Sequence, residues 1–212
     1  MGKKKNISIC LKIFLAAVLA LCFFNLFSFA NCFIKSRNLS MQDNEILRIR
    51  FFGNTEENGT NTVSANIVLL DNAGTEIAVV ERSWNGSFLA MDFVKTEFYG
   101  SNYYFPLDIY AVNSISEVYK NNKNLKKTGT NLTKYYIDLK RCLLVQPIQL
   151  QKKLFSIADF SLNPFIFVSV FFTKKITLSL HECEGGKTYG IYVKKDGIFR
   201  LEEELPANPT DL

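Results

Sequence analysis

The N-terminus constrains this chain more than any other feature, because it decides in which compartment the remaining residues fold. An apolar run from Ile13 to Phe24 follows a group of lysines without any acidic residue: Lys3, Lys4, Lys5 and Lys12. The run of about twelve residues fits a secretory signal better than a membrane span, which needs about 20 residues. Ser28 and Ala30 form a small-residue cleavage site before Asn31. The pattern predicts a signal peptide over residues 1–30 and an exported protein, periplasmic or at the cell surface.

Two other fates of this segment stay open. Cys32 follows the apolar run as a lipid-modified cysteine would, although Phe29 and Asn31 stand where a bacterial lipidation motif usually has Leu and a small residue. The longer stretch Ile13–Phe29 could also span a bilayer without cleavage, if Asn25 and Ser28 are tolerated there. The alternatives to a released protein are therefore a lipoprotein attached through Cys32 and a membrane-anchored protein.

Charge separates the leader from the rest of the chain. The whole sequence has 25 basic and 20 acidic residues, and the four lysines of the leader account for most of the difference. A nearly neutral mature chain lacks the basic face that nucleic acids require, so we expect no nucleic-acid partner. The roughly 180 residues that follow the leader are enough for one domain with its own core.

The rest of the chain has the pattern of an all-β protein. Aromatic residues make up 14% of the sequence, and short β-rich runs alternate with turn-forming residues, as in an antiparallel β-sandwich or, alternatively, a small β-barrel. No long amphipathic helix is expected. The apolar run Phe165–Phe172 is predicted to be a strand covered on both faces, and residues 53–61 are predicted to be a loop. The expected strands are Glu45–Phe52, Val63–Leu70, Thr75–Arg82, Ser87–Val94, Leu107–Val112, Tyr135–Val145, Phe165–Phe172, Ile176–Cys183, Thr188–Lys194 and Ile198–Glu203.

The C-terminal strands are the most readable part. Asp196 and Gly197 between two alternating runs predict a tight hairpin. The segment Gly186–Tyr189, followed by Ile191 and Val193, resembles the penultimate strand of an immunoglobulin-like sandwich over about thirteen residues. This resemblance implies a fold and no particular function.

Domain boundaries are few. We expect a tether over residues 31–44, a single β domain over residues 45–205 and a frayed tail over residues 206–212. A stretch rich in Lys and Asn, residues 120–134, contains no acidic residue and is the only candidate for a subdivision. Such a stretch is usually a solvated loop, and the alternative is contact with an anionic surface.

Cysteine and histidine chemistry is sparse. Cleavage of the leader would leave Cys32, Cys142 and Cys183; the last two could form a disulfide or stay buried as unpaired thiols. The one histidine, His181, shares a predicted strand face with Cys183. No second histidine or CxxC pair supports a zinc site, so we predict neither a metal ion nor a cofactor.

No catalytic motif occurs, and we predict a protein that binds or scaffolds without catalysis. An enzyme that uses two carboxylates on envelope polysaccharide is an alternative, because acids can meet in space. The acids beside apolar runs are Asp92, Asp108, Asp138 and Asp159.

A recognition site is predicted around the only tryptophan, Trp84, with Arg82 beside it and Tyr103 and Tyr104 as further candidates. An aromatic ring in this setting could stack on a sugar or cap a peptide groove of an envelope partner. The alternative, which we favour, is that Trp84 fills one end of the sandwich core. The sequence thus predicts an exported β domain of a bacterial envelope, with membrane association through the N-terminus as an option.

Overall fold

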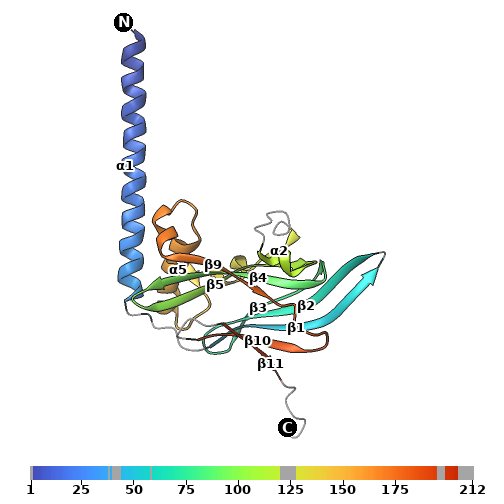
Figure 1. Cartoon of the computed structure of the whole chain (residues 1–212). Coiled ribbons are helices and arrows are strands. Elements are labelled where there is room, and N and C mark those ends of the chain that lie inside the picture. Colours follow the sequence, from blue (N-terminus) through green and yellow to red (C-terminus); the bar gives the residue numbers. More distant parts are fainter. Residues whose placement is uncertain are drawn as a thin grey trace.

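The computed structural model describes residues 2–37, 39, 44–57, 59–119, 128–194 and 199–204. A long helix, α1 (Gly2–Ser36), projects from one end of a domain built of antiparallel strands (Figure 1). The predictions for residues 120–127, for the turn at 195–198 and for the tail at 206–212 lie outside the described residues. Because α1 continues to Ser36, the first part of the predicted tether is helical.

Two antiparallel sheets pack as an open sandwich, which confirms the predicted fold class. The first has the strand order β11-β10-β1-β2-β3, and the second has the order β6-β5-β4-β9. The described sheets do not close, so the alternative of a small barrel is wrong. The strands of the first sheet are β1 (Asn44–Glu57), β2 (Thr60–Leu70), β3 (Glu76–Asn85), β10 (Thr188–Val193) and β11 (Phe199–Glu204). Those of the second are β4 (Phe88–Phe98), β5 (Ser101–Val112), β6 (Thr130–Asn131) and β9 (Thr173–Ser179).

The hairpin of β2 and β3 forms where turn residues predicted it. The side-chain Oδ1 of Asp71 accepts hydrogen bonds from the backbone N–H groups of Ala73 and Thr75, at 2.8 and 2.9 Å. Gly74 has a φ of +78°, which most other residues adopt only with strain. The turn thus fixes the register of the two strands.

Several strands differ from their predicted bounds. Residues 53–57 extend β1 instead of forming a loop, so β1 and β2 make a long hairpin that projects beyond the sandwich (Figure 1). Strand β5 begins at Ser101 and includes Pro106, which lies beside a bulge opposite Phe93. Strand β9 pairs with β4 in the second sheet. The C-terminal strands therefore are not one meander, although β10 and β11 do form the predicted hairpin.

The crossing from β3 to β4 requires a glycine. Gly86 has a φ of +151°, and a Cβ atom there would lie 2.7 Å from the Cβ of Ala111. Only a residue without a side chain fits so close an approach. This crossing carries the chain from the first sheet to the second.

The segment between β6 and β9 is mainly helical, and here the strand predictions are wrong. The predicted strand Tyr135–Val145 is a short helix α4 (Thr133–Tyr136) and a small hairpin of β7 (Ile137–Asp138) and β8 (Arg141–Cys142). Helix α5 (Ile148–Leu162) follows, and it buries residues three or four positions apart: Gln151, Leu154, Ile157, Ala158 and Phe160. Because polar residues interrupt this apolar stripe, the sequence did not predict an amphipathic helix here. A further short helix, α2 (Ile115–Tyr119), follows β5.

The predicted strand Phe165–Phe172 is instead a short 3-10 helix, η1 (Phe167–Phe171). The backbone turns at Asn163, whose side-chain Oδ1 accepts a hydrogen bond from the N–H of Phe165 at 3.0 Å. Within the run, Ile166 and Ser169 are buried, whereas Phe165, Phe167, Val170 and Phe171 are 66%, 57%, 73% and 85% exposed. The prediction of a strand covered on both faces is therefore wrong.

The larger hydrophobic core draws on both sheets, on α5 and on the end of α1. Its fully buried side chains include Phe93 and Phe105 of the second sheet and Ile49 and Ile67 of the first. Cys32 of α1 belongs to the same cluster. The end of the N-terminal helix is thus part of the sandwich core.

Candidate functional site

The junction between α1 and the domain is the most distinctive region. Cys32 is 0% exposed, and Ser36 is also buried. The hydroxyl group of Tyr103 donates a hydrogen bond to the backbone carbonyl of Leu39 at 2.7 Å and lies 3.3 Å from that of Ser36. The last turns of α1 are therefore held by the domain and not only joined to it.

A polar side chain in the middle of the apolar helix ties α1 to η1. The Nδ2 of Asn25 donates to the carbonyl oxygens of Leu21 at 2.9 Å and of Phe165 at 3.2 Å. Its Oδ1 accepts from the backbone N–H of Val168 at 3.4 Å. A buried amide is stable only when its groups are paired, and here both ends of Asn25 are paired with the same short segment.

Aromatic rings fill the space between these elements. The ring of Phe29 lies 5.1 Å from that of Phe172 and 6.2 Å from that of Phe160. Phe98 stacks on Phe172 at 5.4 Å, and Phe33 lies 4.4 Å from Tyr99. Edge and tilted ring contacts of this kind add to the hydrophobic stabilisation. The contacts join α1, α5, η1 and the turn between β4 and β5 into one unit.

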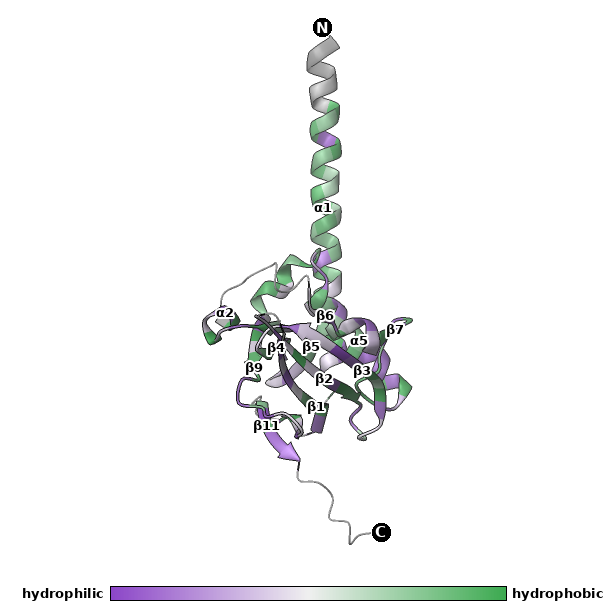
Figure 2. Ribbon diagram, turned by 90° about the vertical axis from the view of Figure 1, so that its right-hand side faces the viewer, coloured by the Kyte–Doolittle hydropathy of each residue, from purple (hydrophilic) through white to green (hydrophobic). Residues whose placement is uncertain are grey.

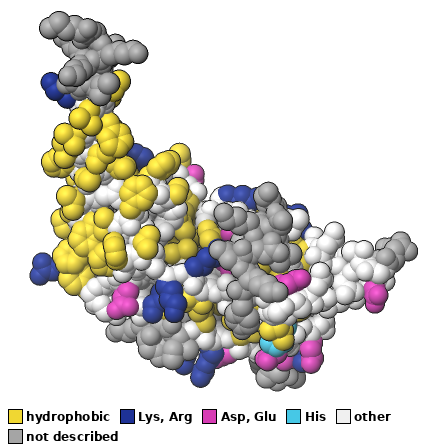
Figure 3. Space-filling view, turned by 45° about the horizontal axis from the view of Figure 1, so that its top comes forward, with side chains coloured by type: hydrophobic (Ala, Val, Ile, Leu, Met, Phe, Trp, Pro, Cys, Tyr) yellow, Lys and Arg dark blue, Asp and Glu magenta, His cyan; other side chains and the backbone are white. Residues whose placement is uncertain are grey.

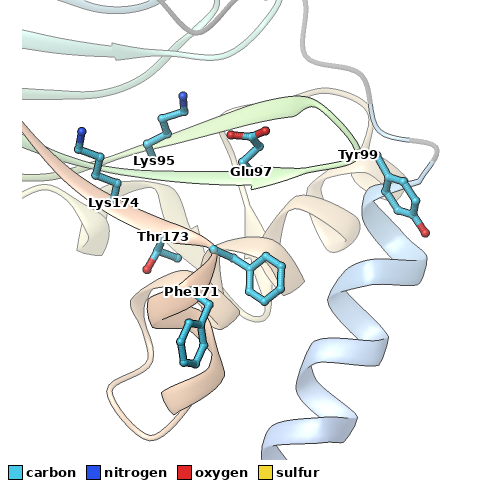
Figure 4. A pocket seen from close by; sticks show the side chains of 7 residues that line it. Lys95, Glu97, Tyr99, Phe171, Thr173 and Lys174 are labelled. Carbon is cyan, nitrogen blue, oxygen red and sulfur yellow. The ribbon is translucent and has the colours of Figure 1, made fainter.

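The outer surface of this unit is apolar. Figure 2 shows hydrophobic residues along α1, and Figure 3 shows hydrophobic side chains gathered over α1 and the adjoining part of the domain. Figure 4 shows that Phe171 of η1 lines one pocket together with Lys95 of β4 and Lys174 of β9, so two cations border the apolar surface here. Soluble domains rarely expose so large a continuous apolar surface.

Helix α1 is long and apolar enough to cross a membrane. Within the stretch Ile9–Ser36, the most apolar window of 18 residues has a mean hydropathy of 2.4. No residue between Lys12 and Lys35 is charged. As a helix, this stretch of roughly 22 residues is about 33 Å long, which matches the hydrocarbon thickness of a bilayer. By length and composition the helix fits either a signal sequence or a membrane anchor.

A groove runs between α1 and α5. Its volume is about 580 Å³, and its walls come from α1, α5, the β7–β8 turn and Ile166. Its lining includes the apolar side chains of Phe24 and Phe27 and the cationic side chains of Lys35, Lys140 and Lys152. The Nζ of Lys35 donates a hydrogen bond to the Oγ of Ser156 at 2.7 Å, which links the two helices at the basic end.

The residues predicted for recognition do not form a common surface. Trp84 is buried, with its indole N–H inside the protein and the guanidinium group of Arg82 6.0 Å from its ring. Arg82 also donates to the hydroxyl group of Thr130 at 3.0 Å. Tyr103 and Tyr104 are buried in β5, near the turn of the β4–β5 hairpin. The burial of Trp84 agrees with the favoured interpretation that it fills the core.

The cysteines are all free thiols in the structure. Cys142 is buried against α5, and Cys183 is half-buried. Burial raises the pKa of each thiol to about 12, so neither forms the reactive thiolate at neutral pH. Cys32, the candidate for lipidation, is buried in the core.

His181 lies beside Ser179, whose hydroxyl oxygen is 3.1 Å from the imidazole Nδ1. Its Nε2 lies 3.5 Å from a carboxylate oxygen of Glu182. Within the described part of the chain, no group of three His, Cys, Asp or Glu side chains could hold a metal ion.

Two of the four candidate carboxylates are neighbours, because Asp92 of β4 and Asp108 of β5 are cross-strand partners; Asp138 and Asp159 lie in other elements. Asp92 is 0% exposed; it accepts a hydrogen bond from Thr177 at 2.6 Å and forms an ion pair with Lys175 at 2.9 Å. Asp138 pairs with Arg141 at 3.0 Å, and Asp159 lines the groove beside α1. Such pairing is typical of structural acids as well as functional ones.

Comparisons with family models, with curated proteins and with solved structures found no match to this chain. The class of protein therefore follows from its own structure. The chain is a β-sandwich protein with a long apolar N-terminal helix.

Sequence inspection missed the groove and the apolar surface around η1. One signal was present: the run Phe165–Phe172 has no polar residue except Ser169 and is too short to span a membrane. An uncharged run of this kind also fits a segment that lies against lipid. Asn25, which interrupts the apolar run of the leader, hydrogen-bonds to the backbone of this segment.

Proposed function

We propose that this protein is an exported β-sandwich protein of the cell envelope, held at the membrane by an uncleaved α1, and that it acts by binding or scaffolding without catalysis. One observation carries the proposal: the last turns of α1 belong to the core of the domain. Cleavage before Asn31 would remove Asn25 and Phe29, and with them the contacts to Phe165, Val168 and Phe172. A leader that is only a targeting signal has no need of such contacts.

Charge supports the orientation. Lysines cluster before the apolar stretch of α1, at Lys3, Lys4, Lys5 and Lys12. Basic residues favour the cytoplasmic side of a membrane, so the domain after Ser36 would lie on the outer side. The exposed phenylalanines of η1 would then meet the outer leaflet, because Asn25 holds η1 beside the middle of the uncharged stretch.

The working surface would be the part of the sandwich that faces away from the membrane. The β1–β2 hairpin projects beyond the two sheets at a distance from α1 (Figure 1). A protein or glycan of the envelope is the class of partner that this location makes accessible. Among the described residues, Asp92 and Asp108 are neighbouring candidate acids, but Asp92 is buried and ion-paired with Lys175, which favours a structural role for it over a catalytic one.

The experiment that tests the proposal is the intact mass of the protein expressed in a bacterium, measured in membrane and soluble fractions. We expect a mass that includes residues 1–30, found in membranes that resist alkaline carbonate extraction, with the domain digestible from the outer side. A soluble species that begins at Asn31 would overturn the proposal. A species that begins at Cys32 with acyl chains would instead establish the lipoprotein.

A matched variant separates anchoring by a retained α1 from anchoring by a lipid on Cys32. Replacement of Cys32 by Ser should leave membrane attachment unchanged if α1 is retained, because Cys32 then only fills the core. If the protein is lipidated, C32S would release it or block its processing.

A further inference from the structure

The groove between α1 and α5 is amphipathic along its length. The residues of α1 that line it recur every three or four positions: Phe24, Phe27, Ser28, Asn31 and Lys35. The residues of α5 do the same: Lys152, Phe155, Ser156 and Asp159. The two helices are antiparallel, since Lys35 bonds to Ser156 while Asn25 bonds to Phe165, which follows α5. One end of the groove is therefore apolar and the other is basic.

The apolar end lies at the depth of lipid chains if α1 spans the membrane. Phe24 and Phe27 belong to the uncharged stretch between Lys12 and Lys35, and both are exposed. Phe27 is two turns of helix, or about 12 Å, from Lys35. This spacing places the phenylalanines within the leaflet and Lys35 near its surface.

The basic end has an excess of positive charge. Lys35, Lys140 and Lys152 line it from three different elements, and among the described lining residues Asp159 is the only acid. Basic pockets beside membrane helices are suited to phosphate head groups. Lysine ammonium groups bind phosphate as point charges and do not require one fixed geometry.

The β7–β8 turn supplies an independent observation. Leu139 and Lys140 have φ values of +44° and +62°, a region that L-residues other than Asn rarely adopt. Two-residue turns with this backbone normally contain Asn and Gly. Leu139 is also 83% exposed. A strained turn that presents an apolar and a cationic side chain to the groove indicates a functional constraint.

We infer that this groove binds one anionic glycerophospholipid from the outer leaflet, with an acyl chain along Phe24 and Phe27 and the phosphate among Lys35, Lys140 and Lys152. The groove has the size usual for small-molecule sites. The inference rests on the proposed membrane anchoring, because the groove meets lipid only if α1 is retained. The bound lipid would fix the angle between α1 and the domain.

The test uses the full chain made by cell-free synthesis into micelles, where no signal peptidase removes residues 1–30. Native mass spectrometry would count bound phosphatidylglycerol, with phosphatidylcholine and inorganic phosphate as separate probes. We expect at least tenfold tighter binding of phosphatidylglycerol than of phosphatidylcholine. Equal binding of the two lipids would overturn the inference, as would binding of inorganic phosphate that equals that of the lipid.

Three variants sharpen the result. Simultaneous K35Q, K140Q and K152Q changes should weaken phosphatidylglycerol binding at least tenfold. The matched control, with K134Q, K153Q and K194Q, removes the same charge away from the groove and should bind as the parent does. The change D159N should tighten binding a few-fold, because it removes the acid that faces the phosphate. An unchanged affinity in the groove variant would refute the site.

Failure of the two proposals can be told apart. If native protein begins at Asn31, the anchoring is wrong whatever the micelle experiment shows. If native protein keeps α1 but the groove variant binds lipid as the parent does, the anchoring stands and only the lipid site is wrong.

Discussion

Strand β4 and helix η1 show opposite relations between polarity and burial. β4 contains Asp92, Lys95 and Glu97, yet most of the strand is buried. The run that forms η1 has no charged residue, yet Phe171 is 85% exposed. A segment with three charged residues is covered by protein here, and a segment without any is not.

The neighbours of the two segments explain the difference. β4 lies between β5 and β9, and the charge of Asp92 is balanced by Lys175. η1 has protein on one side only, where Asn25 and Phe29 of α1 meet it. The difference teaches that exposed apolar side chains must be judged against the solvent around them, and under the proposed anchoring that solvent would be lipid for η1.

The largest expected effect compares one phenylalanine from each segment. F93A should lower the free energy of unfolding by about 3–5 kcal/mol, because it opens a cavity in the core. F171A should change it by less than about 0.5 kcal/mol. Denaturant unfolding of the full-length protein in micelles measures both. Similar losses for the two variants would mean that η1 is covered by protein in solution.

A smaller effect is expected from the buried acid of β4. D92A should destabilise the protein by about 2–4 kcal/mol, because it leaves Thr177 and Tyr110 without their acceptor and Lys175 without its counter-ion. The control is D138A, which removes an exposed acid of β7 that is ion-paired with Arg141. Equal and small losses of unfolding free energy in both variants would show that the ion pair and hydrogen bonds of Asp92 do not stabilise β4.

The link between η1 and α1 can be cut at Asn25. N25L should cost about 1–3 kcal/mol, because it leaves the Phe165 carbonyl and the Val168 N–H without partners. Amide hydrogen exchange at Val168 should rise, while exchange in β4 stays as in the parent. The isosteric control L26N, on an exposed position of α1, should leave exchange at Val168 as it is. Unchanged exchange at Val168 in N25L would contradict the role of Asn25.

The smallest effect is a gain. L139N should raise the free energy of unfolding by about 1 kcal/mol, because Asn tolerates the left-handed backbone better than Leu. The same change should reduce binding of phosphatidylglycerol, and thermal unfolding with and without this lipid measures both effects. A loss of stability would show that Leu139 contributes contacts beyond the turn.

Local signals predicted the two sheets well. The β2–β3 hairpin formed at Asp71 to Gly74, and the β10–β11 hairpin formed as expected, since alternation and turn residues act over a few neighbours. The same signals failed between β6 and β9. Tyr135–Val145 has strand-like alternation, but α5 packs on β8 and shortens the strands there to two residues each.

Of the candidate site, only single residues could be predicted. Cys32 stood out beside the leader. The groove could not be predicted, because it needs α1 and α5 side by side, and its Lys35 and Ser156 are more than 100 residues apart. Trp84 was rightly favoured as a core residue, because a large aromatic side chain in a strand is usually buried.

By itself the sequence determined the class of the fold and the presence of a long apolar N-terminus, because β-propensity, turn residues and apolar length are local properties. Only the tertiary structure decided that the end of α1 belongs to the core, that η1 is exposed and that lysines from three elements meet beside an apolar groove. These features depend on contacts between residues far apart in the chain, such as Asn25 with Phe165 and Lys35 with Ser156. No local pattern encodes such contacts, because the sequence around each of these residues is equally compatible with other environments.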